Sequence, residues 1–184
     1  ARTSKDSPSL LCARWRGAAY DGRGAGESVR PSIRAGYRLE QLADDFFAIV
    51  ESIKAENPDG ARAKVHVFAH DWGSIQTWES VTDPRAQDVI ATYTSMSGPC
   101  LDHIAHLMRR APLKHPLSVL GQSVKSWYVY FFHLPLIPEM VWRAPLAQRI
   151  FSNRPTLRGD GAKGVNLYRA NIPRRLSNHC QLAT

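Results

Sequence analysis

The chain has 184 residues, a hydrophobic fraction of 43% and a formal net charge of +8. This length suits one domain with a sizeable core, and no apolar run is as long as a membrane span. The basic residues are scattered and form no stripe with interleaved aromatic residues, so nucleic acid is not expected as a partner. Three cysteines, Cys12, Cys100 and Cys180, are at no metal-binding spacing. They indicate a reducing compartment, and a cytoplasmic location is therefore expected.

Residues 1–16 have no hydrophobic period and are expected to be irregular. The small and apolar residues Gly17–Tyr20 predict the end of a short buried strand. The glycine-rich loop Asp21–Ser28 follows, and loops at the carboxyl ends of strands build the binding sites of open α/β sheets. Its glycine spacing differs from that of dinucleotide-binding loops, and no Lys-Ser or Lys-Thr pair follows, as a phosphate-binding loop requires. No cofactor and no metal ion are therefore expected.

Four segments in the first half predict a parallel sheet with helices on its faces. Apolar residues recur on one face over Tyr37–Ile53, which predicts an amphipathic helix. After a turn at Asn57–Gly60, Lys64–Ala69 predicts a strand and Ile75–Val81 a helix. Val89–Met96 predicts another buried strand. The order β, α, β, α, β is typical of a parallel sheet.

The turn between the strand ending at Ala69 and its following helix carries the strongest chemical signal. His70–Gly73 has the form of a nucleophile elbow, a strained turn that exposes one side chain at the top of a sheet. Ala69 and Gly73 are expected to flank it because larger side chains would clash there. The exposed position holds Asp71, whose carboxylate can attack carbon and form an ester with the enzyme. The simpler interpretation is a buried strand followed by an Asp that caps a helix.

After Pro99 the pattern changes from strands to helices. The expected pieces are a helix at Leu101–Met108, a long apolar and aromatic stretch at Leu117–Phe132, a helix at Val141–Phe151, a loop at Pro155–Gly164 and a return to the core from Val165. Helices inserted after a sheet strand are what a cap over an active site would look like. The expected organisation is an irregular start at 1–16, a core part at 17–98, a helical cap at 99–164 and a return to the core at 165–184.

Four motifs occur between Gly17 and Asn171. They are a Tyr-Asp-x-Arg-Gly-x-Gly-x-Ser loop at Tyr20–Ser28, the Asp-type elbow at His70–Gly73, an aromatic helix at Ser126–Phe132, and Asn166–Asn171, similar to Asn-Trp-Tyr-Arg-Asn. Together they resemble the α/β-hydrolase superfamily, in the branch of epoxide hydrolases and haloalkane dehalogenases. More narrowly, the chain is similar to the hydrolase half of actinobacterial proteins that join such a domain to a short-chain dehydrogenase.

The resemblance implies an α/β-hydrolase core, with a mainly parallel sheet and a helical cap inserted after a core strand. It implies Asp71 as the nucleophile and the backbone N–H of Trp72 as an oxyanion-hole donor. Tyr128 and Tyr168 would donate hydrogen bonds to the epoxide oxygen, a role that suits phenols with a pKa of ~10. Tyr130 competes with Tyr128 but is expected on another face of the helix. The implied partner is a small epoxide or a related apolar molecule.

Hydrolysis of the ester needs a water activated by a His, which an Asp or Glu orients. In the family these residues follow the second tyrosine motif, and a His-Gly-x-Pro segment precedes the glycine-rich loop. This chain matches neither, and His179 follows Tyr168 too soon to be the base. The fold is therefore expected to be incomplete at both ends, with residues 1–16 and 174–184 foreign to it, and catalytic competence is open.

Two alternatives remain open from the sequence. A haloalkane dehalogenase would bind halide with Trp72 and a cap tryptophan such as Trp127 or Trp142. A non-catalytic fragment would retain only the scaffold. The pair of tyrosine motifs favours the epoxide hydrolase, and the sequence does not indicate an oligomeric state.

Overall fold

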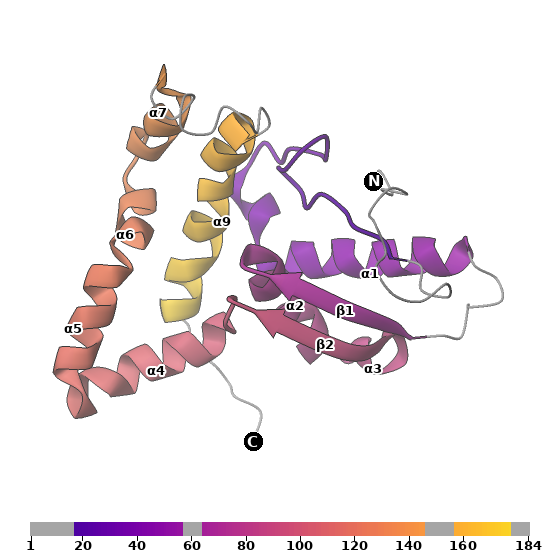
Figure 1. Ribbon diagram of the computed structural model, residues 1–184, viewed down its shortest axis with the longest axis horizontal. Coiled ribbons are helices and arrows are strands. Elements are labelled where there is room, and N and C mark those ends of the chain that lie inside the picture. The colour runs from indigo at the N-terminus through magenta and orange to yellow at the C-terminus, as the bar shows by residue number, and fades with distance from the viewer. Residues whose placement is uncertain (1–16, 57–63, 146–156, 178–184) are drawn as a thin grey trace.

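The computed structural model describes residues 17–56, 64–145 and 157–177, whose arrangement is shown in Figure 1. A parallel sheet and helix α1 lie on one side, and the short helices α5, α6 and α7 form a column on the other side. The last helix, α9, runs between the column and the sheet. No helix in these three ranges is long and apolar enough to cross a membrane.

The first described helix is α1 (Leu39–Ala55), which the 3-10 turn η1 (Arg34–Tyr37) precedes. Its buried residues recur at helical spacing and include Leu39, Leu42, Phe46 and Val50. The helix predicted at Tyr37–Ile53 is therefore confirmed. Its apolar face packs on the sheet and on α2 (Trp72–Thr82), which follows the first strand.

The sheet consists of two parallel strands, β1 (Val65–His70) and β2 (Ile90–Met96). Parallel strands need a crossover connection, which α2 and the short helix α3 (Ala86–Val89) provide. The register pairs Val67 with Tyr93 and His70 with Met96, so both strands end at the same level. The two predicted strands and the predicted parallel sheet are confirmed.

One face of the sheet is packed and the other is open. Phe46, Phe47 and Val50 of α1 form a buried cluster against Val65 and Val67. Burial alternates along β1, because successive side chains of a strand point to opposite faces. The alternate positions include Phe68, which is exposed. The core of this half therefore lies between the sheet and α1.

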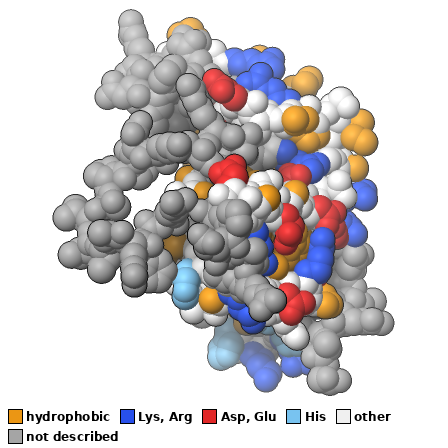
Figure 2. All heavy atoms as spheres, turned by 90° about the vertical axis from the view of Figure 1, so that its right-hand side faces the viewer, with side chains coloured by type: hydrophobic (Ala, Val, Ile, Leu, Met, Phe, Trp, Pro, Cys, Tyr) orange, Lys and Arg blue, Asp and Glu red, His pale blue; other side chains and the backbone are white. Residues whose placement is uncertain are grey.

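The surface shown in Figure 2 carries acidic and basic side chains close together. Ion pairs of the described residues include Arg85 with Asp44 (3.0 Å) and Asp83 (2.7 Å), and Arg23 with Asp45 (2.5 Å). The first two pairs are exposed, and exposed pairs contribute little to stability.

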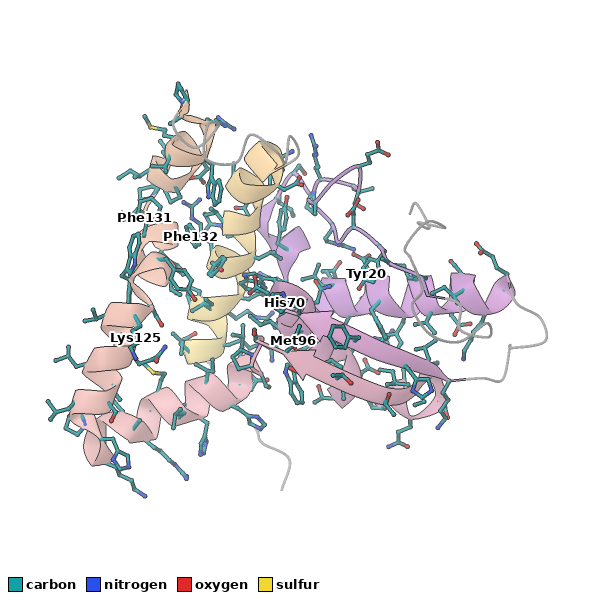
Figure 3. All side chains as sticks on the ribbon, in the orientation of Figure 1. Tyr20, His70, Met96, Lys125, Phe131 and Phe132 are labelled. Atoms are coloured by element: carbon teal, nitrogen blue, oxygen red, sulfur yellow. The ribbon has the colours of Figure 1, made fainter. Side chains whose placement is uncertain are left out.

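The second half begins with four consecutive helices. They are α4 (Leu101–Lys114), α5 (Pro116–Lys125), α6 (Trp127–His133) and α7 (Ile137–Arg143). Of the helix predicted at Val141–Phe151, residues 141–143 are helical and form the end of α7. This helix begins earlier than predicted, and Pro138 lies in its first turn, where proline is tolerated. Residues 146–151 lie outside the described residues. In Figure 3, Phe132 points from α6 toward α9, where its ring contacts Tyr168 at a centroid distance of 4.8 Å.

Helix α9 (Leu157–Ser177) contradicts the loop predicted at Pro155–Gly164. The stretch contains three glycines, and at least one of them is required by packing. A Cβ on Gly161 would lie 2.7–2.9 Å from three atoms of the Trp142 indole. The close approach of α7 to α9 therefore needs a glycine in a helix, and tertiary packing overrides the low helix propensity.

Two further predictions near the chain ends are wrong. Gly17–Tyr20 is not a strand and is largely exposed, because no described strand pairs with it. Residues 174–177 are not foreign to the fold, because they complete α9 and carry ion pairs to three other helices. Arg175 pairs with Glu79 of α2 (2.7 Å) and Asp102 of α4 (2.9 Å), and Arg174 pairs with Glu40 of α1 (2.6 Å). Residues 1–16 and 178–184 lie outside the described residues.

Candidate active site

Asp71 lies between β1 and α2 in a backbone conformation that L-residues rarely adopt. Its φ is 52° and its ψ is −126°, which is strained for a residue with a Cβ. Backbone hydrogen bonds hold the turn, from Asp71 N–H to Met96 O (3.0 Å) and from Ile75 N–H to Asp71 O (2.9 Å). The predicted strained turn, with Asp71 at the head of the strand, is confirmed.

A buried hydrogen-bond network fastens the start of α2 to the segment that follows β2. The Ser74 hydroxyl donates to Gly98 O (2.9 Å), and the Trp78 indole N–H donates to the same carbonyl (3.0 Å). The hydroxyls of Tyr93 and Ser95 lie 2.8 and 2.6 Å from Ser74 Oγ. Sequence analysis missed this network, because its members lie on different elements and Ser74 looks like any other helix residue.

The glycine that is crowded against the elbow is Gly98, in the segment after β2, and not Gly73. A Cβ on Gly98 would lie 2.3 Å from Asp71 O and 2.5 Å from Ser74 Cβ. A Cβ on Gly73 would meet no atom within 4 Å in the described part of the chain. The expected clash at Gly73 is therefore wrong, because the turn packs against the connection after β2 and leaves position 73 open.

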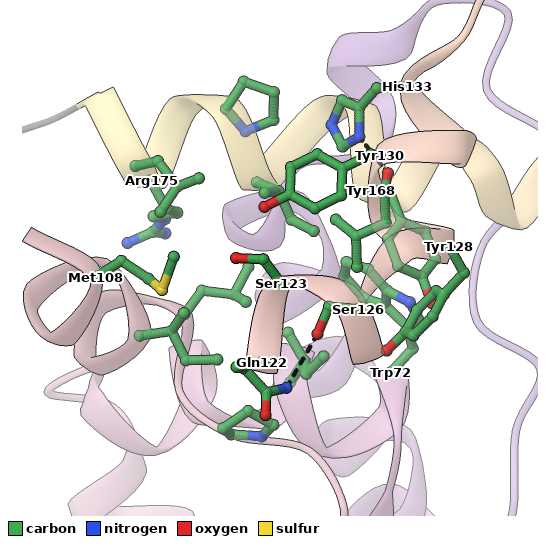
Figure 4. Close-up of a pocket in the computed structure, with 18 of the residues that line it drawn as sticks. Trp72, Met108, Gln122, Ser123, Ser126, Tyr128, Tyr130, His133, Tyr168 and Arg175 are labelled. Atoms are coloured by element: carbon green, nitrogen blue, oxygen red, sulfur yellow. Dashed lines mark hydrogen bonds between the residues drawn. The ribbon is translucent and has the colours of Figure 1, made fainter. Parts of the chain in front are cut away.

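A cavity of about 510 Å³ opens beside the elbow, and Asp71, Trp72, Tyr128 and Tyr168 all line it. These four residues come from three elements: the β1–α2 turn with the start of α2, then α6, then α9. In Figure 4, Trp72, Tyr128 and Tyr168 lie toward one end, and Met108 and Arg175 toward the other. Much of the remaining wall is apolar, formed by Ile75, Pro99, Leu101, Ile104, Val129, Ile172 and Leu176.

Tyr168 lies at the centre of an aromatic cluster at the nucleophile end of the cavity. Its ring is 4.8 Å from the Trp72 ring and 6.4 Å from the Tyr128 ring, between centroids. Burial raises the pKa of the Tyr168 phenol, and the negative charge of Asp71 raises it further. The nearby Trp72 indole N–H has the opposite effect and lowers this pKa. It makes no hydrogen bond of normal geometry to the described residues. The phenol therefore stays protonated, as a donor must.

Arg169 connects the helix of one tyrosine to the helix of the other. Its Nε donates to Phe132 O at the end of α6 (2.8 Å), and Nη2 donates to Glu139 of α7 (3.1 Å). Nη1 donates to the other Glu139 carboxylate oxygen and Nη2 also to Leu134 O, so the guanidinium is almost fully engaged. The Arg169 side chain is only 9% exposed. It fixes α6, which carries Tyr128, against α9, which carries Tyr168.

Asn171 fixes α9 against the start of α1. Its Nδ2 donates to Tyr37 O and Leu167 O, both at 2.8 Å, and its Oδ1 accepts from Leu39 N–H at 2.9 Å. The first N–H groups of a helix lack partners within that helix. Asn171 therefore caps α1 from a distant part of the chain, one turn of α9 away from Tyr168.

Two residues line the cavity that sequence analysis did not place there. Tyr130 was expected on a different face from Tyr128, yet both line the cavity, because its wall extends around α6. His133 also lines it, with Nδ1–H donating to Val129 O (2.7 Å) and Nε2 buried without a hydrogen-bond partner in the described residues. His70 is exposed and does not line the cavity. His179 lies outside the described residues.

The glycine-rich loop is packed on the protein and does not line this cavity in the described chain. Gly24 has a φ of +86°, and a Cβ there would lie 2.6 Å from the Tyr37 ring. Gly26 N–H donates to Asp160 of α9 (3.1 Å), and Arg23 pairs with Asp45 of α1. These contacts give the loop a structural role.

No family model matches the chain. Among curated proteins, it is 31% identical over 188 residues to "Probable oxidoreductase EphD" of Mycobacterium tuberculosis, covering 92% of this chain and 31% of that protein. It is 27% identical over 157 residues to human "Epoxide hydrolase 4", covering 83% of this chain and 38% of that protein. The chain therefore spans about a third of the length of these curated relatives.

Among solved structures, the chain is similar to one described as "Novel epoxide hydrolases belonging to the alpha/beta hydrolases superfamily in metagenomes from hot environments". The two share a TM-score of 0.58 at 19% identity, over 89% of this chain and 55% of that chain. This likeness confirms the α/β-hydrolase fold class that the sequence predicted.

Proposed function

The chain belongs to the epoxide-hydrolase branch of the α/β-hydrolase superfamily, and on this premise we propose that it opens epoxides by forming an ester at Asp71. The observation that carries the proposal is that Asp71, Tyr128 and Tyr168 line one cavity although they come from separate elements. The apolar wall beyond them supports a small epoxide with apolar substituents as the substrate.

The proposed chemistry uses the strained turn and the two phenols. An oxygen of the Asp71 carboxylate attacks a ring carbon of the oxirane, and the bond from that carbon to the ring oxygen breaks. The ring oxygen takes a proton from Tyr128 or Tyr168 as its negative charge develops. The product is a hydroxy ester attached to Asp71, and the phenolate regains its proton from water. The backbone N–H of Trp72 would contribute to an oxyanion hole when the ester is later hydrolysed.

The second half of hydrolysis needs a base that activates water against the ester. The family resemblance implies a His for this step, from a motif that the 184 residues do not contain. We therefore propose that this chain, by itself, forms the ester and releases it slowly or not at all. The proposed helical cap, residues 99–164, would carry Tyr128, and the segment after it would carry Tyr168.

A haloalkane dehalogenase is the second candidate, and the described chain favours it less. That reaction needs two side-chain donors for the halide, such as Trp72 with Trp127 or Trp142. Trp72 lines the cavity, but in the described residues neither Trp127 nor Trp142 does. Trp127 is exposed on α6, and Trp142 packs against Gly161 of α9.

Mass spectrometry of the intact chain after incubation with a reactive aliphatic epoxide tests the proposal. The expected result is an adduct with the mass of protein plus epoxide, which peptide mapping places on Asp71. Asp71→Asn should form no adduct. Tyr128→Phe and Tyr168→Phe should each slow adduct formation about a hundredfold, since removal of one donor to a developing oxyanion typically costs about 3 kcal/mol.

The outcomes separate the three candidates. An adduct from a haloalkane that has lost the halide, with no adduct from the epoxide, would support the dehalogenase. Sustained release of diol would show that a base is present and that the proposed arrest at the ester is wrong. If the folded chain forms no adduct with either reagent, the non-catalytic scaffold is supported.

A further inference from the structure

The outer surface of α5, α6 and α7 exposes large apolar side chains in a regular pattern. Leu117, Leu120, Val124 and Trp127 follow one another at intervals of three or four residues along α5 and the start of α6, and all are more than 60% exposed. This spacing places Leu117, Leu120 and Val124 on one face of α5, and Trp127 follows at the start of α6. Exposed apolar patches of this kind mark interaction sites in soluble proteins.

Helix α7, the next helix of the column, exposes large apolar side chains too. Leu136 and Met140, at the start of α7 and within it, are also exposed. Figure 1 shows α5, α6 and α7 stacked as a column on the side of the molecule remote from α1. We define the apolar stripe as Leu117, Leu120, Val124, Trp127, Leu136 and Met140. None of the described helices covers it, as the exposure of these side chains shows.

The charges near the apolar stripe are mostly basic, and the acid beside Met140, Glu139, is paired with Arg169 of α9. Residues 103–138 contain no Asp or Glu, whereas the whole chain has 16. The same stretch contains four Lys and Arg residues: Arg109, Arg110, Lys114 and Lys125. Arg110 and Lys114 lie one turn apart on α4, are exposed, and directly precede α5. By contrast, the face in Figure 2 mixes both signs.

We propose that the apolar stripe, with Arg110 and Lys114 beside it, docks this protein onto an anionic lipid surface. Helices that lie in a membrane interface combine an apolar face containing Trp and Leu with basic residues and few acids. Basic residues near such a surface gain attraction from anionic headgroups. This docking is independent of the reaction at Asp71 and needs no membrane-spanning helix.

A second copy of the chain is a less suitable occupant of the stripe. A symmetric dimer buries the same patch of both copies. It would therefore bring two copies of α4 and α5 together in a stretch, residues 103–138, that has basic residues and no acidic ones. An anionic lipid surface supplies the opposite charge over the whole contact.

Vesicle sedimentation with the full 184-residue chain tests the docking. The probes are vesicles of phosphatidylcholine alone and of an equimolar mixture of phosphatidylcholine and phosphatidylglycerol. The chain should sediment with the mixed vesicles, and high salt should reduce this binding because salt screens the charges. With vesicles of phosphatidylcholine alone, most of the chain should stay in the supernatant. Trp127 fluorescence should shift to shorter wavelength on binding, and a Trp127→Phe variant should lose that component.

Two variants separate the apolar and the charged contributions. Leu117→Ser/Leu120→Ser should weaken binding strongly, whereas Val29→Ser, at an equally exposed position outside the column (81% against 82% for Leu117), should not. Arg110→Glu/Lys114→Glu should weaken binding at least about 25-fold, since each basic residue near an anionic surface is worth roughly fivefold. Arg38→Glu/Lys54→Glu on the α1 side changes the net charge equally and should have little effect. Circular dichroism confirms that each variant is folded.

Three results would overturn the proposal. The first is no binding to the anionic vesicles at low salt. The second is equal loss of binding in both charge variants, which would reduce the effect to net charge. The third is a concentration-dependent dimer, measured by analytical ultracentrifugation without lipid, that Leu117→Ser/Leu120→Ser dissociates, which would assign the stripe to a second copy.

Discussion

Replacing Asn171 by Leu should destabilise the protein because it removes the cap that α9 provides for α1. Leucine has the same branched shape and number of side-chain heavy atoms as asparagine, so the change removes hydrogen bonds without leaving a void. Asn171 is 1% exposed, and water is therefore poorly placed to replace its amide. Leu167 O can keep its bond within α9, but Leu39 N–H and Tyr37 O lose the partners that lie 2.9 and 2.8 Å away.

The two groups that lose their partners determine the size of the effect. A buried polar group left unsatisfied costs about 1–3 kcal/mol. Two such groups, offset in part by the burial of an apolar side chain, predict a loss of about 3 kcal/mol. With a urea m-value of about 2 kcal/mol per M, the midpoint of unfolding should fall by about 1.5 M.

Urea unfolding followed by circular dichroism measures this change, with Asn166→Leu as the control. Asn166 is half-buried on the same helix, and its replacement should change stability by well under 1 kcal/mol. If Asn171→Leu changed the stability no more than Asn166→Leu, the cap would not hold α9 in place. The ion pairs of Arg174 and Arg175 with Glu40, Glu79 and Asp102 would then be the contacts that dock this helix.

Two further predictions concern the elbow and the clamp between the tyrosine helices. Gly98→Ala should cost about 1–3 kcal/mol through overpacking against Asp71 O and Ser74, whereas Gly73→Ala should be nearly neutral. Thermal unfolding of the pair measures this, and equal effects would contradict it. Burial alone would raise the pKa of the Glu139 carboxyl, but Arg169, a backbone hydrogen bond and the charge of Arg143 together lower it. Above the ordinary carboxyl pKa of about 4.3, the Glu139→Gln variant should therefore be less stable than the unmodified chain. The difference in stability should disappear as the pH falls below that value, because the carboxyl group of the unmodified chain becomes protonated. A constant difference down to pH ~3 would contradict the ion pair.

The elements that the sequence predicted correctly are those whose signal is local. The apolar period of α1 and the runs that form β1 and β2 need no information about distant partners. The turn at Asp71 was predictable for the same reason, since a strand, a short turn and a helix follow one another directly. The roles of Asp71, Trp72, Tyr128 and Tyr168 stay predictions, although the structure brings all four to one cavity.

The parts that the sequence did not predict depend on contacts between distant segments. The Ser74 network joins positions about 20 residues apart, and Asn171 caps a helix 132 residues earlier. Gly17–Tyr20 has the composition of a strand, but a strand requires a hydrogen-bonded neighbour, and no described strand provides one. The first turns of α9 have the composition of a loop, and their helical form depends on contacts with distant residues such as Trp142 of α7 and Gly26.

The last of these cases gives a direct test, because two of the three glycines of α9 lie in opposite surroundings. A Cβ on Gly161 would collide with the rigid Trp142 indole, whereas a Cβ on Gly164 would meet no atom within 4 Å in the described chain. In a helix, Gly→Ala gains up to about 1 kcal/mol of propensity when the new methyl group is free.

Gly164→Ala should therefore raise the stability, and Gly161→Ala should lower it despite the same gain in propensity. Urea unfolding of the two variants measures both signs, and Gly161→Ala/Trp142→Ala separates the collision from other effects. The unfavourable effect of Gly161→Ala should shrink or reverse when Trp142 is already replaced, because the colliding ring is absent. If Gly164→Ala gave no gain and Gly161→Ala no loss, the segment before Val165 would behave as the loop that its glycines suggest.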